Sequence, residues 1–130
     1  MFGDVAPALI AYLADRIEGV RVVSRVPDPR PPRLLQVRRV GGAAVPPVRE
    51  TVRLDIQAWD TSDPAAMQLA LAARTHVWAL AGTSLLGAAC YRVEELLAPR
   101  LDDDPVTNSP VAWATYSLLM RADDAVPPTP

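Results

Sequence analysis

The sequence predicts an α+β domain in which a mostly antiparallel sheet of four to five strands is covered by two helices and carries a long protruding β-hairpin. Two segments with helical periodicity are separated by runs of adjacent strand-like segments, a pattern typical of antiparallel sheets. A chain of 130 residues can bury about two-thirds of its unfolded surface and so fold without staples. We therefore expect one domain over residues 1–121 and a flexible tail over residues 122–130, whose apolar content is low.

The first expected element is an amphipathic helix. Asp4 is its predicted N-cap, Pro7 is tolerated in the first turn, and Gly19 is the predicted stop. Apolar residues recur every four positions and form one stripe, made of Val5, Leu9, Leu13 and Ile17. A strand is expected at 20–26. The proline-rich segment 27–33 follows as a stiff connector, because proline donates no hydrogen bond to a sheet.

The predicted hairpin occupies residues 33–59. Its second strand is the clearest in the chain, with buried-type Val52, Leu54, Ile56 and Ala58 alternating with Arg53, Asp55, Gln57 and Trp59. Gly41 and Gly42 are expected to supply positive φ angles where the chain leaves the first strand. The loop would then run on through Pro46 and Pro47 and protrude.

A second helix is expected from a cap at Ser62 or Asp63 to about Ala81, with Gly82 as the stop. Helical spacing places one set of residues on a single face: Met67, Ala70, Leu71, Arg74, Val77, Trp78 and Ala81. Residues 88–97 form the next predicted strand, with Tyr91, Val93, Glu95 and Leu97 on one face. Residues 98–110 are loop-like. Residues 111–120 are apolar on both faces, which predicts a central strand.

Composition narrows the classes of function. The net charge of −2 gives no electrostatic footprint for nucleic acid or membrane. Every basic residue is arginine, which indicates a GC-rich coding bias more strongly than selection for bidentate interface contacts. The first residues lack the basic start of a signal peptide, and no apolar run is long enough to span a bilayer. We expect synthesis and folding in the cytosol.

Residues with catalytic or metal-binding chemistry are sparse. His76 and Cys90 are single, so neither an ordinary structural zinc site nor a disulfide is expected, and no nucleophile motif accompanies them. The acidic run Asp102, Asp103 and Asp104 lacks the spacing of a calcium loop and is interpreted as a solvated loop. Glu94 and Glu95 point to opposite strand faces and make no acid–base pair. We predict no enzyme activity, no cofactor and no metal.

Four arginines lie close together in the predicted hairpin, at positions 38, 39, 49 and 53. A nucleic-acid surface would need more net positive charge and stacking aromatic residues, and Trp59 is the only aromatic residue nearby. Trp59 has two interpretations that the sequence leaves open. It is either a tryptophan at the rim of the core or an interface anchor.

Several stretches together resemble one protein family. They are the opening DVAPALIAYLADR, then GVRVVSRVPDPRPPRLLQVRRVGG, ETVRLDIQAWD, SDPAAMQLALAARTHVWAL, CYRVEEL and the closing WATYSLLMR. Their order, their spacing and the corner Arg39-Val40-Gly41-Gly42 resemble the tail terminator (tail completion) proteins of long-tailed bacteriophages. The resemblance covers the whole chain except its C-terminal segment 122–130, and it includes no catalytic signature.

The resemblance implies a structural virion protein. Such proteins form a ring, here a homo-hexamer, that caps the tail tube, ends its growth and joins the tail to the head or neck. The implied partners are further copies of the chain, the tail tube protein and a neck or head-completion protein, with DNA only passing through the lumen and no membrane. The implied location is the head-proximal end of the tail, after assembly in the host cytoplasm. A head–tail connector (neck or stopper protein) of the same region of the virion is the alternative. A small nucleic-acid-binding module and an enzyme are less favoured by the sequence.

On this hypothesis, the subunit or tube interface consists of Arg38, Arg39, Gly41, Gly42, Arg49, Arg53 and Trp59. Asp102, Asp103 and Asp104 form a candidate lumen loop, where negative charge would keep DNA from adhering. Replacing Arg38 and Arg39 with glutamate is expected to weaken ring formation while the monomer stays folded.

Overall fold

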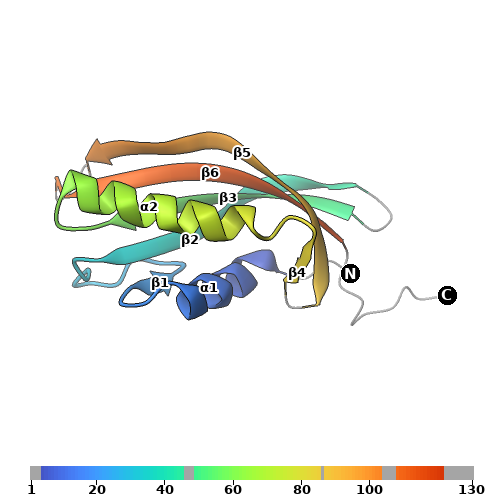
Figure 1. Cartoon of the computed structure of the whole chain (residues 1–130), viewed down its shortest axis with the longest axis horizontal. Coiled ribbons are helices and arrows are strands. Elements are labelled where there is room, and N and C mark those ends of the chain that lie inside the picture. Colours follow the sequence, from blue (N-terminus) through green and yellow to red (C-terminus); the bar gives the residue numbers. More distant parts are fainter. Residues whose placement is uncertain (1–3, 46–48, 86, 104–107, 122–130) are drawn as a thin grey trace.

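The computed structural model describes residues 4–45, 49–85, 87–103 and 108–121 (Figure 1). Its elements in chain order are α1 (Val5–Arg16), β1 (Arg21–Val23), β2 (Leu34–Val45), β3 (Arg49–Trp59), α2 (Asp63–Trp78), β4 (Thr83–Leu85), β5 (Ala88–Asp103) and β6 (Pro110–Arg121). The fold is α+β, with two helices and a mostly antiparallel, curled sheet, as expected. The sheet has six strands, whereas four to five were expected. The strand that the prediction missed is β4, whose three residues are too few to show an alternating pattern.

The strand order is β1-β2-β3-β6-β5-β4, and every pairing except the parallel β1–β2 pair is antiparallel. The apolar strand β6 is central, between β3 and β5, which confirms the prediction from its composition. The outermost strands each pair along only three residues of their neighbours. Most of β2 and β5 therefore lies beyond the reach of β1 and β4.

The helix α1 forms where its stripe and cap predict. The Asp4 side chain accepts a hydrogen bond from the Ala6 backbone N–H, 3.2 Å from Oδ1, and so satisfies one free donor of the first turn. The four stripe residues are all buried: Val5, Leu9, Leu13 and Ile17. Gly19 follows the helix with φ +71°. Strand β1 is shorter than the predicted 20–26, because the chain bends after Val23.

The β2–β3 hairpin differs from the prediction at its glycines. Gly41 and Gly42 lie inside β2, beside a register shift between Arg39 and Gly41, with φ of +127° and +125°. The two strands stay paired as far as Val45 and Arg49, so the connection is 46–48 and the predicted long loop is wrong. Pro46 and Pro47 lie outside the described residues. The paired strands extend toward one end of the molecule (Figure 1).

The helix α2 begins as expected but presents a different face. The Ser62 side chain accepts a hydrogen bond from the Ala65 N–H at 3.3 Å. The helix ends at Trp78 rather than Ala81. Its buried residues are Ala66, Leu69, Ala70, Ala73 and Val77. Leu71 and Trp78, which belong to the predicted face, are 39% and 47% exposed, because the side of the helix that packs on the sheet is centred on Ala66, Ala70 and Ala73.

Strand β5 continues to Asp103, beyond the predicted end at 97. Three register shifts interrupt its pairing with β6. One of them, between Glu95 and Leu97, moves Leu97 to the opposite face from Val93 and Glu95, so the predicted common face is wrong. Another, between Leu97 and Arg100, accommodates Pro99, which is tolerated because β4 does not reach this part of β5 and its outer side needs no hydrogen-bond donor.

Candidate functional site

Both helices of the described residues pack on one face of the sheet, and we call the other face the open face. Residues directly opposite in an antiparallel pair share a face. The helix-covered face is therefore defined by the buried residues of β3 and β6, which join both helices in one core: Val52, Leu54, Ile56, Ala58, Ala112, Ala114, Tyr116, Leu118 and Met120. The alternate positions of the same strands form the open face.

The open face holds large apolar side chains that nothing in the described chain covers. Val40, Leu96 and Leu97 are 44%, 39% and 46% exposed. They line a groove of about 410 Å³ together with Arg53, Asp55, Trp113 and Thr115. The groove crosses β2, β3, β6 and β5, so the four long strands all contribute to it. We call it the open-face groove.

Among the described residues, the open face carries more guanidinium groups than carboxylates. Its arginines are Arg38, Arg49, Arg53, Arg92, Arg100 and Arg121, and its acids are Asp55, Glu94 and Asp102. Asp55 accepts a hydrogen bond from the Thr115 hydroxyl at 2.6 Å. The surface is thus locally basic although the whole chain has a net charge of −2.

Two aromatic rings on this face stack with arginine. The guanidinium carbon of Arg100 lies 4.3 Å from the ring centroid of Trp113, and that of Arg49 lies 5.1 Å from the ring of Tyr91. Cation–π contacts of this kind favour these positions of the two arginine side chains. The indole Nε1 of Trp113 is buried and has no hydrogen-bond partner in the structure.

One end of the open face is covered by the chain itself. Leu34, Trp59 and Val111 form a small second core there. Arg30, from the proline-rich connector, lies 5.7 Å over the Trp59 ring and donates a hydrogen bond to the Ser109 hydroxyl at 2.8 Å. With 5% of its surface exposed, Trp59 fits the first of its two interpretations, a residue at the rim of the core.

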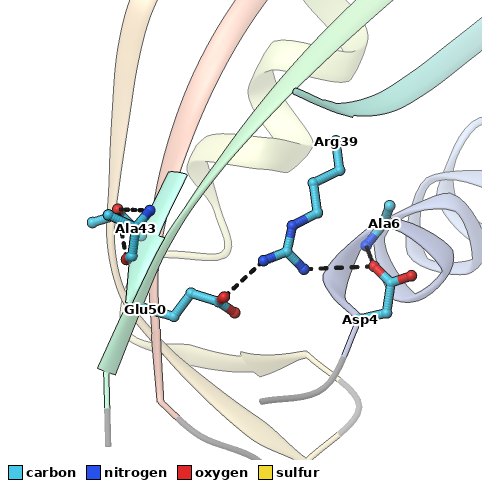
Figure 2. Close-up of polar contacts among 6 residues, drawn as sticks. Asp4, Ala6, Arg39, Ala43 and Glu50 are labelled. Atoms are coloured by element: carbon cyan, nitrogen blue, oxygen red, sulfur yellow. Dashed lines mark hydrogen bonds and ion pairs between the residues drawn. The ribbon is translucent and has the colours of Figure 1, made fainter. Parts of the chain in front are cut away.

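The structure separates the four hairpin arginines. Arg38, Arg49 and Arg53 lie on the open face, whereas Arg39 lies on the helix side. Arg39 Nη2 donates a hydrogen bond to Glu50 Oε2 at 2.7 Å, and its Nη1 lies 3.7 Å from Asp4 Oδ1, the N-cap of α1 (Figure 2). Its guanidinium group is therefore engaged within the monomer.

The remaining predicted site residues lie apart from these arginines. Gly41 and Gly42 are strand residues, not a loop. Asp102 and Asp103 are exposed at the end of β5 that pairs with the start of β6, which is the end of the sheet away from the hairpin connection. Asp104 lies outside the described residues. The acidic run and the hairpin thus belong to opposite ends of the molecule.

A partly buried polar cluster under α2 was not predicted from the sequence. Arg74 and Glu95 form an ion pair, in which Arg74 Nη2 donates a hydrogen bond to Glu95 Oε2 at 2.9 Å. Arg74 Nε lies 2.8 Å from Glu95 Oε1, but this contact lacks hydrogen-bond geometry. Beside them the Tyr116 hydroxyl is buried without a partner. Burial raises the pKa of Tyr116, the Glu95 carboxylate raises it further, and Arg74 opposes the shift. The sequence indicated this cluster only through Glu95, which strand alternation places on the same face as Val93.

This cluster borders a second hollow, of about 280 Å³, lined by Trp78, Ala81, Val93 and Glu95. The Arg74 guanidinium lies 4.0 Å from the Trp78 ring. The Glu95 carboxylate is already paired, so the hollow offers an aromatic surface without an available anion.

His76 and Cys90 occupy structural positions. The Tyr12 hydroxyl donates a hydrogen bond to the His76 carbonyl at 2.8 Å, and the two rings meet edge to face with centroids 6.5 Å apart. Cys90 is 1% exposed, and burial raises the pKa of its thiol, which keeps it in the less reactive protonated form. No cluster of three or more His, Cys, Asp or Glu side chains suited to a metal ion occurs within the described ranges.

In the part of the chain that the structure describes, no helix is long and apolar enough to cross a membrane.

No family model matches the chain, and no curated protein matches it significantly. The open face, with its groove and its arginines, is the candidate functional surface of the described residues.

Proposed function

We propose that this protein is a non-enzymatic structural virion protein of the phage tail terminator type. In this proposal, copies of the chain form a ring, with six as the expected number, that caps the tail tube, ends its growth and joins the tail to the head or neck. The proposal combines the sequence resemblance with the surface described above.

The observation that carries the proposal is the open face. An antiparallel sheet often leaves one face in water, and that face then carries mainly polar side chains. Here the uncovered side holds three large apolar residues, Val40, Leu96 and Leu97, beside exposed arginines. Apolar contact area rimmed by guanidinium groups is typical of protein–protein interfaces, which are enriched in arginine and aromatic residues.

The placement of charge supports association in a ring. The hairpin arginines Arg49 and Arg53 lie toward the hairpin connection, whereas Asp102 and Asp103 lie at the opposite end of the sheet. A contact between unlike patches of identical subunits is heterologous, and such contacts form closed rings when the rotation between subunits closes. Asp102 and Asp103 remain candidates for the lumen.

The direct test measures mass in solution by light scattering behind a sizing column over a concentration series. The proposal expects a species near six times the chain mass of 14.0 kDa. A second arm adds purified tail tubes and looks for caps on tube ends by electron microscopy. A monomer at all concentrations that also leaves tube ends bare would overturn the proposal.

A head–tail connector is distinguished by the same second arm. A connector would bind the head portal or neck complex without closing free tube ends. Binding to purified necks in the absence of tube capping would therefore favour this alternative.

A nucleic-acid-binding module is the second candidate, and a specific observation favours it. Trp113 and Tyr91 stack with arginines on the same locally basic surface, the combination that single-stranded nucleic acids bind. Fluorescence anisotropy with labelled single-stranded DNA tests it. Tight binding that falls steeply with salt would support this module, whereas a ring that DNA only passes through should bind weakly.

A further inference from the structure

We propose that the open-face groove binds the acidic, proline-rich segment 122–130 of a neighbouring copy of the chain. The inference rests on the proposed function in one respect, because the ring supplies the neighbour. It identifies which part of one copy meets which surface of the next.

The groove has the chemistry of a site for proline-rich peptides. Such peptides form a polyproline II helix and bind to apolar grooves with aromatic walls. Trp113, with the Arg100 guanidinium over its ring, supplies the aromatic wall, and Leu96 and Leu97 supply apolar surface. Polyproline II carbonyls are free to accept hydrogen bonds because the helix has no internal ones. The guanidinium group of Arg53, which lines the groove, is a donor for them.

The segment has the complementary chemistry. It reads ADDAVPPTP, so Pro127 and Pro130 have the P-x-x-P spacing of polyproline II ligands. Asp123 and Asp124 precede the prolines and carry the charge opposite to that of the open face. Arg53 lines the groove and makes no hydrogen bond or ion pair with another described residue, so its guanidinium is available to a carboxylate.

Chain geometry favours a neighbour over the same copy. From Thr115 in the groove to Arg121 the strand rises roughly 20 Å, and it runs away from the groove. To return in the same copy, the chain would have to reverse directly after Arg121. The reversal would use the residues around Asp123 and Asp124 and leave the prolines short of Trp113, because polyproline II advances only about 3.1 Å per residue. A segment from a neighbouring copy needs no reversal.

The test uses full-length chains and the indole N–H signals of the three tryptophans in NMR spectra. A ¹⁵N-labelled chain carries D123N, D124N, P127A and P130A, so that its own segment cannot fill its groove. Unlabelled wild-type chain, or a synthetic peptide of residues 122–130, is then added. W113F and W78F variants assign the signals. We expect a saturable shift of the Trp113 indole and no shift of the Trp78 indole.

A matched pair of arginine variants tests the charge component. Arg53→Gln should weaken peptide binding roughly tenfold or more, since a hydrogen bond to a charged group contributes about 1.5–3 kcal/mol. Arg25→Gln removes an exposed arginine outside the groove and should leave the affinity unchanged.

The outcomes separate this inference from the proposed function. No saturable Trp113 shift with either ligand overturns the inference, even if the ring forms. If the Trp113 signal shifts but the protein stays monomeric and leaves tail tubes uncapped, the proposed ring is overturned and the peptide site in the groove stands. The Trp113 indole signal of the wild-type chain alone could lie at the bound position while added wild-type chain never shifts that signal in the labelled variant. In that case the segment binds within its own copy, and the assignment to a neighbouring copy fails.

Discussion

Arg39 shows at the residue scale how a charge pattern divides into separate roles. It is adjacent to Arg38, yet the alternation of a strand sends the two side chains to opposite faces. Arg39 joins the two strands of the hairpin through Glu50 and connects them to Asp4 at the start of α1 (Figure 2). The expectation that both arginines serve an intersubunit contact therefore applies better to Arg38.

The first prediction compares these neighbours. Arg39→Ala should lower the free energy of unfolding by about 1 kcal/mol, because the largely buried Glu50 carboxylate loses its partner. Arg38→Ala should change it by less than about 0.5 kcal/mol, as is usual for exposed positions. Urea denaturation of both variants measures the difference. Equal effects would show that the Arg39 contacts contribute nothing.

The second prediction concerns Tyr116. Its hydroxyl is buried without a hydrogen-bond partner, so Tyr116→Phe should leave the unfolding free energy equal or raise it by up to about 1 kcal/mol at pH 7. Burial raises the Tyr116 pKa above that of the unfolded chain, so the folded state retains a proton that the unfolded state releases at high pH. Stability should therefore fall as pH rises through about 10, the pKa of an unperturbed tyrosine.

The Tyr116→Phe variant also provides the control through its pH dependence. Denaturation at pH 7, 8, 9 and 10 should give a shallower decline in stability for this variant than for the wild type. Because burial also raises the pKa of Cys90, part of the decline should persist in the variant. Identical slopes would show that the Tyr116 hydroxyl hydrogen-bonds or ionises normally.

The third prediction uses the two adjacent glycines of β2. Both have positive φ, but only at Gly42 would a Cβ collide with the Thr51 carbonyl across the hairpin; at Gly41 nothing lies within 4 Å. Gly41→Ala should cost about 1–3 kcal/mol from backbone strain alone. Gly42→Ala should cost more, because the paired strands must also separate. Thermal denaturation with circular dichroism would reveal the order, and the reverse order would contradict this account.

At the scale of elements, the sequence predicted the parts whose pattern is set locally. Alternation in β3 and the four-residue stripe of α1 place their apolar residues correctly, because burial on one face requires that periodicity. The failures occur where neighbouring elements decide. The sequence does not show that Gly41 and Gly42 form an irregularity inside a strand, since that depends on pairing with β3.

The same reason explains the open-face groove. Its residues come from four strands, and register shifts in β5 determine that Leu97 faces it. Such shifts leave no trace in local periodicity. The candidate arginines were identified in the sequence, but their division between two faces and the contribution of Trp113 required the three-dimensional arrangement.

The fourth prediction belongs to α2. Its alanine stripe lets the helix backbone approach the sheet, so Ala70→Leu should destabilise the protein by about 1–3 kcal/mol through overpacking. Gln68→Leu adds a leucine at an exposed position of the same helix and should change stability by less than about 0.5 kcal/mol. Chemical denaturation of both variants tests the packing. A neutral Ala70→Leu would mean that space remains between helix and sheet.

At the scale of the whole molecule, assembly should appear as a concentration-dependent stability. A ring that forms only from folded chains stabilises them by mass action, so the apparent Tm should rise with protein concentration. Guanidinium contacts at the surface are screened by salt, so the rise should be smaller at about 1 M than at about 0.1 M sodium chloride. Differential scanning calorimetry at several concentrations makes this fifth prediction measurable. A constant Tm would argue against assembly in solution.

The order of the strands also has a consequence for the newly made chain. β3 pairs with β6, so Asp55 and Thr115 lie opposite each other although most of the second half of the chain separates them. A ribosome delivers the β2–β3 hairpin well before β6 emerges, and until then the inner edge of β3 has no native partner. Contacts between distant residues slow folding, and an unpaired edge invites pairing with the wrong strand. The interval between the synthesis of the hairpin and that of β6 is therefore when this protein is most exposed to aggregation.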